Sequence, residues 1–94
     1  MLYLVHMQVH IPATLPKGEA DRLKAEEKAY AQTLQHEGKW RHLWRVAGQY
    51  ANYSVFDVGG NDELHDILSS LPLYPYMSLS VTPLAQHPSA IAAN

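Results

Sequence analysis

The segment WRHLWRVAGQYANYSVFDV, residues 40–58, decides the fold, because it alternates as two strands joined by a tight turn around Gly48. It contains more polar side chains, among them two Arg, a His and an Asn, than a hairpin that only fills a core would have. Since large apolar side chains stand on both faces of the first strand, we expect cover on both faces, from the chain's own helices and from a partner subunit. A period of two predicts the faces as Trp40, His42, Trp44 and Val46 against Arg41, Leu43, Arg45 and Ala47.

The rest of the chain places this hairpin in the order βαββαβ. Alternation, helix-forming composition and stop signals predict strands at residues 2–11 and 77–81 and helices at residues 17–37 and 61–71, the second with Asn61 as its N-cap. This order is typical of the ferredoxin-like fold of the α+β class, an antiparallel four-stranded sheet with two helices on one face. We expect one domain over residues 1–94, with a tail at residues 82–94 that lacks clear periodicity.

The composition excludes several classes of function. With 94 residues, 47% of them hydrophobic and 17% charged, the chain suits one globular domain. A net charge of -2, with Lys and Arg scattered, leaves no electrostatic footprint for nucleic acid or an anionic membrane. The absence of cysteine excludes thiol chemistry and suits a reducing cytoplasm. The start, MLYLVHMQVH, is typical of a strand rather than a signal peptide, and no stretch approaches the ~20 apolar residues of a membrane span.

Glu27 interrupts the apolar stripe of the first predicted helix. The stripe recurs at steps of three and four and should face the sheet; its members are Ala20, Leu23, Glu27, Tyr30, Ala31 and Leu34. A carboxylate that faces the sheet loses hydration, which raises its pKa and makes it a stronger base unless a cation compensates. Arg41 and Arg45 are candidate compensators. A structural ion pair, or a position at the edge of the stripe, would explain Glu27 equally well.

Two Arg and one His on the first strand of the hairpin are candidate binding groups. Arg45 lies deep in the strand, and its planar fork suits an internal carboxylate or the carboxylate of a small acidic ligand. Arg41, nearer the strand's start, is more simply explained by a structural role. His42, between Trp40 and Trp44, could relay protons near neutral pH, although a His among aromatic rings is usually a satisfied structural group.

Tyr50, Asn52 and Ser54 share one face of the second strand of the hairpin. Such a row could hold an oxygen-rich ligand, or it could serve ordinary cross-strand pairing. A metal site is not predicted, because His6 and His10 lie ~13 Å apart along one strand at ~3.3 Å per residue, too far for one ion. No phosphate-binding glycine loop or nucleophile elbow is present, so we expect neither a metal nor another cofactor.

Four runs of the chain resemble the muconolactone delta-isomerase family: WRHLWRVAGQYANYSVFDV from Trp40, LKAEEKAYAQTLQ from Leu23, LPLYPYM from Leu71, and His87-Pro88-Ser89. The resemblance covers nearly the whole chain. It implies a ferredoxin-like subunit that pairs through its sheet into a dimeric α/β barrel and assembles further into a homodecamer. It also implies the reaction, in which the ring double bond of muconolactone moves to give 3-oxoadipate enol-lactone in the catechol branch of the 3-oxoadipate pathway, without cofactor or metal.

This implied reaction suggests roles for the candidate residues. Glu27 would remove the ring proton beside the carboxymethyl arm and return one two carbons along, acting as base and then as acid. The substrate is a small lactone carboxylate, and Arg45, with His42 and Arg41 as further candidates, would bind its carboxylate or the developing oxyanion. Donors on the second strand of the hairpin would strengthen their hydrogen bonds as charge grows, namely Tyr50, Asn52 and Ser54.

Three other functions remain open from the sequence. A chloromuconolactone dehalogenase would use the same proton abstraction and then expel chloride. A non-catalytic dimeric α/β barrel protein is the second, since the fold alone settles no function, and a cofactor-free oxygenase is the third. We expect the tail at residues 82–94 to lie on a neighbouring subunit, because the assembled family needs contacts beyond the barrel pair.

Overall fold

The computed structural model describes residues 1–92, and its elements follow the predicted order. They are β1 (Leu2–Val9), α1 (Lys17–His36), β2 (Trp40–Arg45), β3 (Ala51–Asp57), α2 (Asn61–Ser69), the short 3-10 helix η1 (Tyr74–Tyr76) and β4 (Met77–Leu84). The segment MLYLVHMQVH therefore forms a strand, as predicted. No helix formed by residues 1–92 is both long and apolar enough to span a bilayer.

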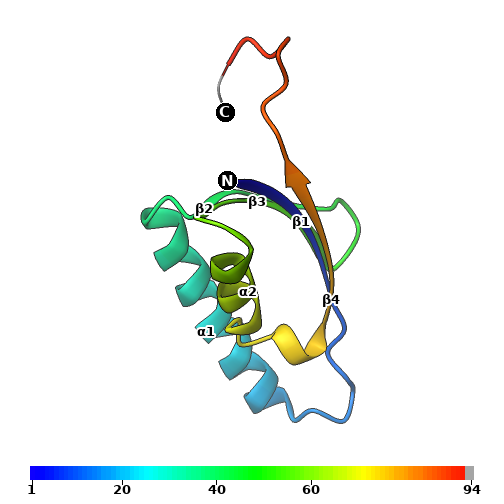
Figure 1. Cartoon of the computed structure of the whole chain (residues 1–94). Coiled ribbons are helices and arrows are strands. Elements are labelled where there is room, and N and C mark those ends of the chain that lie inside the picture. The colour runs from blue at the N-terminus through cyan, green and yellow to red at the C-terminus, as the bar shows by residue number, and fades with distance from the viewer. Residues whose placement is uncertain (93–94) are drawn as a thin grey trace.

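The four strands form one antiparallel sheet in the order β2-β3-β1-β4. Figure 1 shows α1 and α2 on the same, concave side of this curved sheet. We call this side the inner face and the opposite side the open face, which no element of residues 1–92 covers. The arrangement confirms the predicted ferredoxin-like α+β fold with both helices on one face.

The core lies between the two helices and the inner face of the sheet. Tyr3, Val5 and Met7 alternate along β1 toward the helices and are at most 1% exposed. Burying such a side chain contributes roughly 1.5–3 kcal/mol to folding. Opposite them stand the buried residues of α2, which are Leu64, Ile67 and Leu68.

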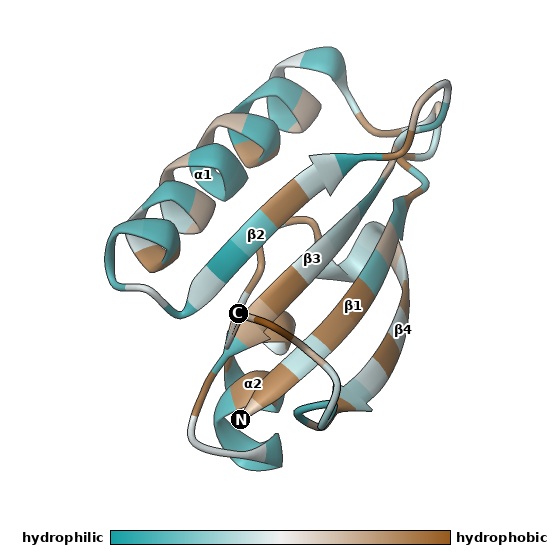
Figure 2. Ribbon diagram, turned by 90° about the horizontal axis from the view of Figure 1, so that it is seen from above, coloured by the Kyte–Doolittle hydropathy of each residue, from teal (hydrophilic) through white to brown (hydrophobic). Residues whose placement is uncertain are grey.

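The predicted stripe of α1 does face the sheet, but it is buried unevenly. Ala20, Ala31 and Leu34 are buried, whereas Leu23, Glu27 and Tyr30 stay partly exposed. In Figure 2 this helix runs along β2, the edge strand of the sheet, while α2 lies under the central strands. The middle of α1 therefore borders a space that its own side chains do not fill.

A bulge in β2 overturns the predicted faces of this strand. Trp40 pairs with Phe56, and the register shifts before His42, which pairs with Val55. The extra residue resets the alternation. Trp40, Leu43 and Arg45 consequently share the inner face, and His42 and Trp44 lie on the open face, so the prediction that Trp40, His42 and Trp44 share a face is wrong.

Two chain reversals depend on glycine at positive φ. Gly38, at φ 79°, lies in the turn that leads from α1 into β2, and Gly48, at φ 80°, lies in the turn of the β2–β3 hairpin. Residues with a side chain rarely adopt such φ angles. The predicted N-cap of α2 is wrong. Asn61 is the first residue of the helix and accepts a hydrogen bond from the Tyr3 hydroxyl, while Glu63 accepts one from the Gly59 N–H at 2.7 Å.

The last strand is longer than predicted, because β4 continues to Leu84 instead of ending at Val81. Pro83, which pairs with Tyr3, is tolerated because β4 is an edge strand and needs no second ladder. Beyond Leu84 the chain leaves the domain (Figure 1), and residues 93–94 of the predicted tail lie outside the described residues.

Candidate active site

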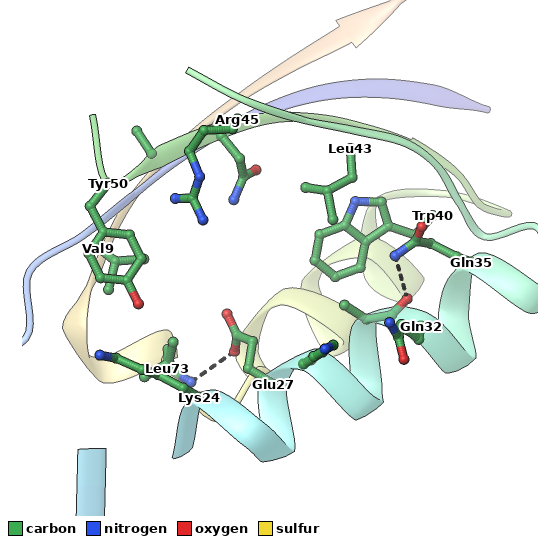
Figure 3. A pocket seen from close by; sticks show the side chains of 14 residues that line it. Val9, Lys24, Glu27, Gln32, Gln35, Trp40, Leu43, Arg45, Tyr50 and Leu73 are labelled. Atoms are coloured by element: carbon green, nitrogen blue, oxygen red, sulfur yellow. Dashed lines mark hydrogen bonds between the residues drawn. The ribbon is translucent and has the colours of Figure 1, made fainter. Parts of the chain in front are cut away.

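A pocket of about 410 Å³ opens between α1 and the inner face of the sheet. The side chains that line it come from five parts of the chain, which are the end of β1, α1, β2, the hairpin with β3, and the loop before η1 (Figure 3). Its lining residues are Val9, Lys24, Glu27, Lys28, Ala31, Gln32, Gln35, Trp40, Leu43, Arg45, Tyr50, Ala51, Asn52 and Leu73.

Glu27 is the only acidic side chain in the lining of this pocket within residues 1–92. It is half-buried, and the loss of hydration raises the pKa of its carboxyl above the ordinary value. The backbone N–H of Leu73 donates a hydrogen bond to Glu27 Oε1 at 3.0 Å, which offsets part of that rise in pKa. Glu27 is thus held in one orientation by a neutral donor, and it is a stronger base than a surface carboxylate.

Arg45 faces Glu27 from the opposite side of the pocket (Figure 3). Neither side chain forms an ion pair within the described part of the chain. Arg45, one of the two candidates to compensate Glu27, does not pair with it. Because base and cation stand apart across an open space, a small anion that lies between them can meet both groups.

The pocket has a cationic end. The Arg45 guanidinium lies 5.3 Å from the centroid of the Tyr50 ring, and Lys24 Nζ lies 5.9 Å from the same centroid. Cations near an aromatic face are attracted by its quadrupole. The two charges and the phenol hydroxyl together suit the carboxylate of a small ligand.

The other end of the pocket holds two large apolar side chains, beside two Gln side chains of α1 (Figure 3). Trp40 packs against Phe56 with ring centroids 4.7 Å apart, and Leu43 lies beside the indole (Figure 3). The Trp40 Nε1 atom has no hydrogen-bond partner among residues 1–92. This end can take the less polar part of a ligand whose charged arm lies near Arg45.

The structure brings four of the predicted site residues into this pocket, namely Glu27, Arg45, Tyr50 and Asn52. Ser54 shares their face of the sheet but is fully buried, and its hydroxyl donates to Asn52 Oδ1 at 2.8 Å rather than lining the pocket. The structure therefore gives no support to direct contact between Ser54 and a ligand.

Two of the predicted site residues, His42 and Arg41, lie outside the pocket that Glu27 lines. The bulge in β2 turns His42 to the open face, where its ring stacks on Trp44 with centroids 5.0 Å apart. Arg41 donates to Asp57 at 2.8 Å in a surface ion pair. Neither side chain lines the pocket in residues 1–92, so the structure gives no support to a catalytic His42 or a substrate-binding Arg41.

Sequence reasoning missed Lys24, Lys28 and the backbone N–H of Leu73. Lys24 could have been found, because it lies three positions before Glu27 on the same helix face, whereas Lys28, the next residue after Glu27, gives no such signal. The Leu73 donor gives no side-chain signal at all, and it reaches Glu27 only because the loop before η1 folds back over α1.

The described residues hold no group of three or more His, Cys, Asp or Glu that could bind a metal ion. His6, one of the histidines rejected as a metal pair, instead packs on Tyr53 of the open face with ring centroids 4.8 Å apart.

The fold and the pocket define a ferredoxin-like α+β enzyme in which a carboxylate of raised pKa faces a cationic, anion-binding end. A family model described as muconolactone delta-isomerase matches residues 1–90. A Muconolactone Delta-isomerase of Cupriavidus pinatubonensis is 66% identical over 91 residues, which are 97% of this chain and 99% of that protein. The chain therefore belongs to the muconolactone delta-isomerase family.

Two further comparisons agree over nearly the full length. A Muconolactone Delta-isomerase of Rhodococcus opacus is 50% identical over 90 residues, 96% of this chain and 97% of that protein. The crystal structure of a muconolactone isomerase matches with a TM-score of 0.94 at 54% identity, and the match covers 100% of this chain and 98% of that chain. The family assignment thus holds for fold as well as for sequence.

Replacing Glu27 by Gln should stabilise the protein increasingly as the pH rises. Burial raises the pKa of Glu27, so the folded state keeps this proton to a higher pH than the unfolded chain does. The free energy of unfolding of the wild type therefore falls as the pH rises from the pKa of Glu27 in the unfolded chain through its raised pKa in the folded state. Gln does not ionise, so the Glu27→Gln variant avoids this loss. Urea denaturation between about pH 4 and pH 8, at one protein concentration, measures the difference.

Glu26→Gln is the matched control for this measurement. Glu26 is the exposed neighbour of Glu27 and pairs with Arg22 at 2.8 Å, so its replacement removes a favourable charge interaction. The stabilisation that grows with pH in Glu27→Gln should be absent from this variant. A Glu27→Gln effect that is identical at every pH would show that the carboxylate is not held in a desolvated site.

Proposed function

We propose that the protein isomerises muconolactone to 3-oxoadipate enol-lactone, in the catabolism of aromatic compounds, by removing one proton and returning another. The observation that carries this proposal is the Glu27 carboxylate, which is partly desolvated, forms no ion pair with residues 1–92 and faces Arg45 across the pocket (Figure 3). Such a pair suits a substrate with both an acidic C–H bond and a carboxylate arm. Membership of the muconolactone delta-isomerase family names that substrate.

The reaction needs a base that can also act as an acid. Glu27 takes the ring proton from the carbon that bears the carboxymethyl arm. The C–H electron pair then spreads through the conjugated double bond onto the carbonyl oxygen of the lactone, which forms a dienolate. The protonated Glu27 then gives a proton to the carbon two positions along, which moves the double bond and restores the carboxylate. A pKa raised toward the working pH favours both half-reactions.

The polarity of the pocket orients the substrate. The carboxymethyl arm lies at the end formed by Arg45, Lys24 and Tyr50, where a permanent negative charge meets two cations. The lactone ring then lies over Glu27 and extends toward Trp40 at the other end (Figure 3). This placement brings the carbon beside the arm close to the base.

The non-catalytic alternative makes a different structural demand. A binding module without chemistry would place Glu27 on the outer helix surface, with no space between helix and sheet. Glu27 instead lines a pocket and accepts a hydrogen bond from the backbone N–H of Leu73, in the loop before η1. No feature of the pocket favours a chloride-expelling enzyme over the isomerase.

Glu27→Gln should lower kcat by ~10² to 10⁴-fold, because Gln keeps the shape and the Leu73 hydrogen bond but cannot accept a proton. The assay follows loss of the conjugated lactone by ultraviolet absorbance. Glu26→Gln should retain wild-type turnover. If Glu27→Gln turns over normally, Glu27 is not the base, and if the wild type leaves muconolactone unchanged, the proposed function itself is wrong.

Arg45→Lys should raise KM for muconolactone roughly tenfold, because a point charge replaces a planar fork that can bind a carboxylate with two hydrogen bonds. Arg41→Lys on the same strand is the matched control, since Arg41 pairs with Asp57 outside the pocket. Initial rates across substrate concentrations measure both. Equal KM values in the wild type and Arg45→Lys would assign Arg45 a structural role.

The same proposal extends to assembly as a homodecamer built from dimeric α/β barrels. Two features support it, the first being the open face, where Trp44 and Tyr53 pair across β2 and β3 and are 59% and 46% exposed. The second is the chain beyond Leu84, which leaves its own domain (Figure 1) and carries a fully exposed Ile91. We propose that sheets pair through the open face, that the tail lies on a neighbouring subunit, and that the enzyme works in the cytoplasm.

Ending the chain after Leu84 should lower the mass of the assembly while leaving the fold intact. This cut preserves all of β4 and its ladder to β1, so loss of intermolecular tail contacts is the main change. Light scattering after size-exclusion chromatography measures the mass, and circular dichroism checks the fold. A truncated protein with the full wild-type subunit number would show that the tail does not join subunits.

A further inference from the structure

Ser54 is the only fully buried polar side chain that residues 1–92 place in the core, and the proposed chemistry gives it no direct contact with substrate. It sits at the centre of β3, between Leu43 of β2 and Val5 of β1. A buried hydroxyl needs an acceptor, because an unpaired O–H loses the hydrogen bond that water would supply. The acceptor is Asn52 Oδ1, at 2.8 Å.

This bond fixes which way the Asn52 amide points. If the amide were turned around, its NH₂ group would face the Ser54 oxygen and the hydroxyl hydrogen would lose its acceptor in an apolar core. The oxygen of Asn52 therefore faces Ser54 at 2.8 Å. The NH₂ group, which has no acceptor among residues 1–92, is left for the pocket that Asn52 lines beside Arg45.

We propose that Asn52 donates a hydrogen bond to the lactone carbonyl oxygen, which gains negative charge in the reaction. Ser54 is the positioning residue that turns the NH₂ group of Asn52 toward that oxygen. This inference rests on the proposed function and assigns its charge-stabilising group. Arg45 meets the carboxylate arm, whose charge is the same before and during the reaction. Asn52 is neutral, so its hydrogen bond gains most when the dienolate forms.

The two residues should therefore affect different kinetic constants from Arg45. Asn52→Ala should lower kcat by ~10²-fold, the usual size for one lost oxyanion donor, with KM within about twofold. Ser54→Ala should lower kcat by about tenfold, because Asn52 remains but is no longer held. Ser70→Ala, which also removes one serine hydrogen bond, at 2.6 Å to Asp66, should leave kcat unchanged.

A double variant separates positioning from a general packing role. If Ser54 acts through Asn52, Ser54→Ala should add no further loss of kcat in an Asn52→Ala background. A second tenfold loss in that background would overturn the proposal. Asn52→Asp, which keeps an acceptor for Ser54 but has no NH₂ group, should lose at least as much kcat as Asn52→Ala, and wild-type kcat in this variant would also overturn it.

A spectroscopic measurement tests the positioning without any activity. In deuterated protein labelled with ¹⁵N-asparagine, the side-chain amide of Asn52 is identified by its disappearance in Asn52→Ala. Ser54→Ala should shift this amide resonance and Ser70→Ala should not. An unshifted resonance refutes the role of Ser54 whether or not the wild type converts muconolactone. An inactive wild type with a shifted resonance refutes the proposed function, and with it the donor role of Asn52, but leaves the positioning of the Asn52 amide by Ser54 in place.

Discussion

The bulge between Trp40 and His42 in β2 is the constraint on which the pocket depends. Under strict alternation Trp40 and Arg45, five positions apart, would project from opposite faces of the sheet. The extra residue resets the period, so that both side chains stand on the inner face, one at each end of the pocket (Figure 3). The same shift sends His42 to the open face. A single irregularity therefore decides which side chains can meet a ligand.

Glu27 is a stronger base because no arginine or lysine of residues 1–92 forms an ion pair with it. An arginine in contact with Glu27 would lower the pKa of the carboxyl and weaken it as a base. Leu73 instead supplies one neutral N–H, which orients the carboxylate and only partly offsets the rise in pKa from desolvation. Arg45 stays on the far wall, where its charge can act on a bound anion. Separating the base from the cation keeps the pocket reactive before substrate arrives.

Much of the fold and part of the site were predictable from sequence, for physical reasons that differ by residue. Helical spacing put Glu27 on the inner side of α1, and alternation correctly aligned Asn52 with Ser54 on β3. The bulge cannot be predicted from the sequence, because the segment after Trp40 alternates well with or without a register shift. The Leu73 donor is a backbone group, and the burial of Ser54 beneath Asn52 depends on packing across three strands, which no local pattern reveals.

Successive residues of β3 serve opposite faces, and this links the chemistry to the proposed assembly. Asn52 and Ser54 lie on the inner face, where Asn52 lines the pocket, while Tyr53 and Val55 face the open side. In the single chain Tyr53 is 46% exposed, so the strand is held on one face only. Under the proposed pairing of sheets, the partner would pack on Tyr53 and restrain the backbone that carries Asn52. A donor must hold its geometry closely to stabilise developing charge, so subunit pairing would contribute to catalysis without placing any partner residue in the pocket.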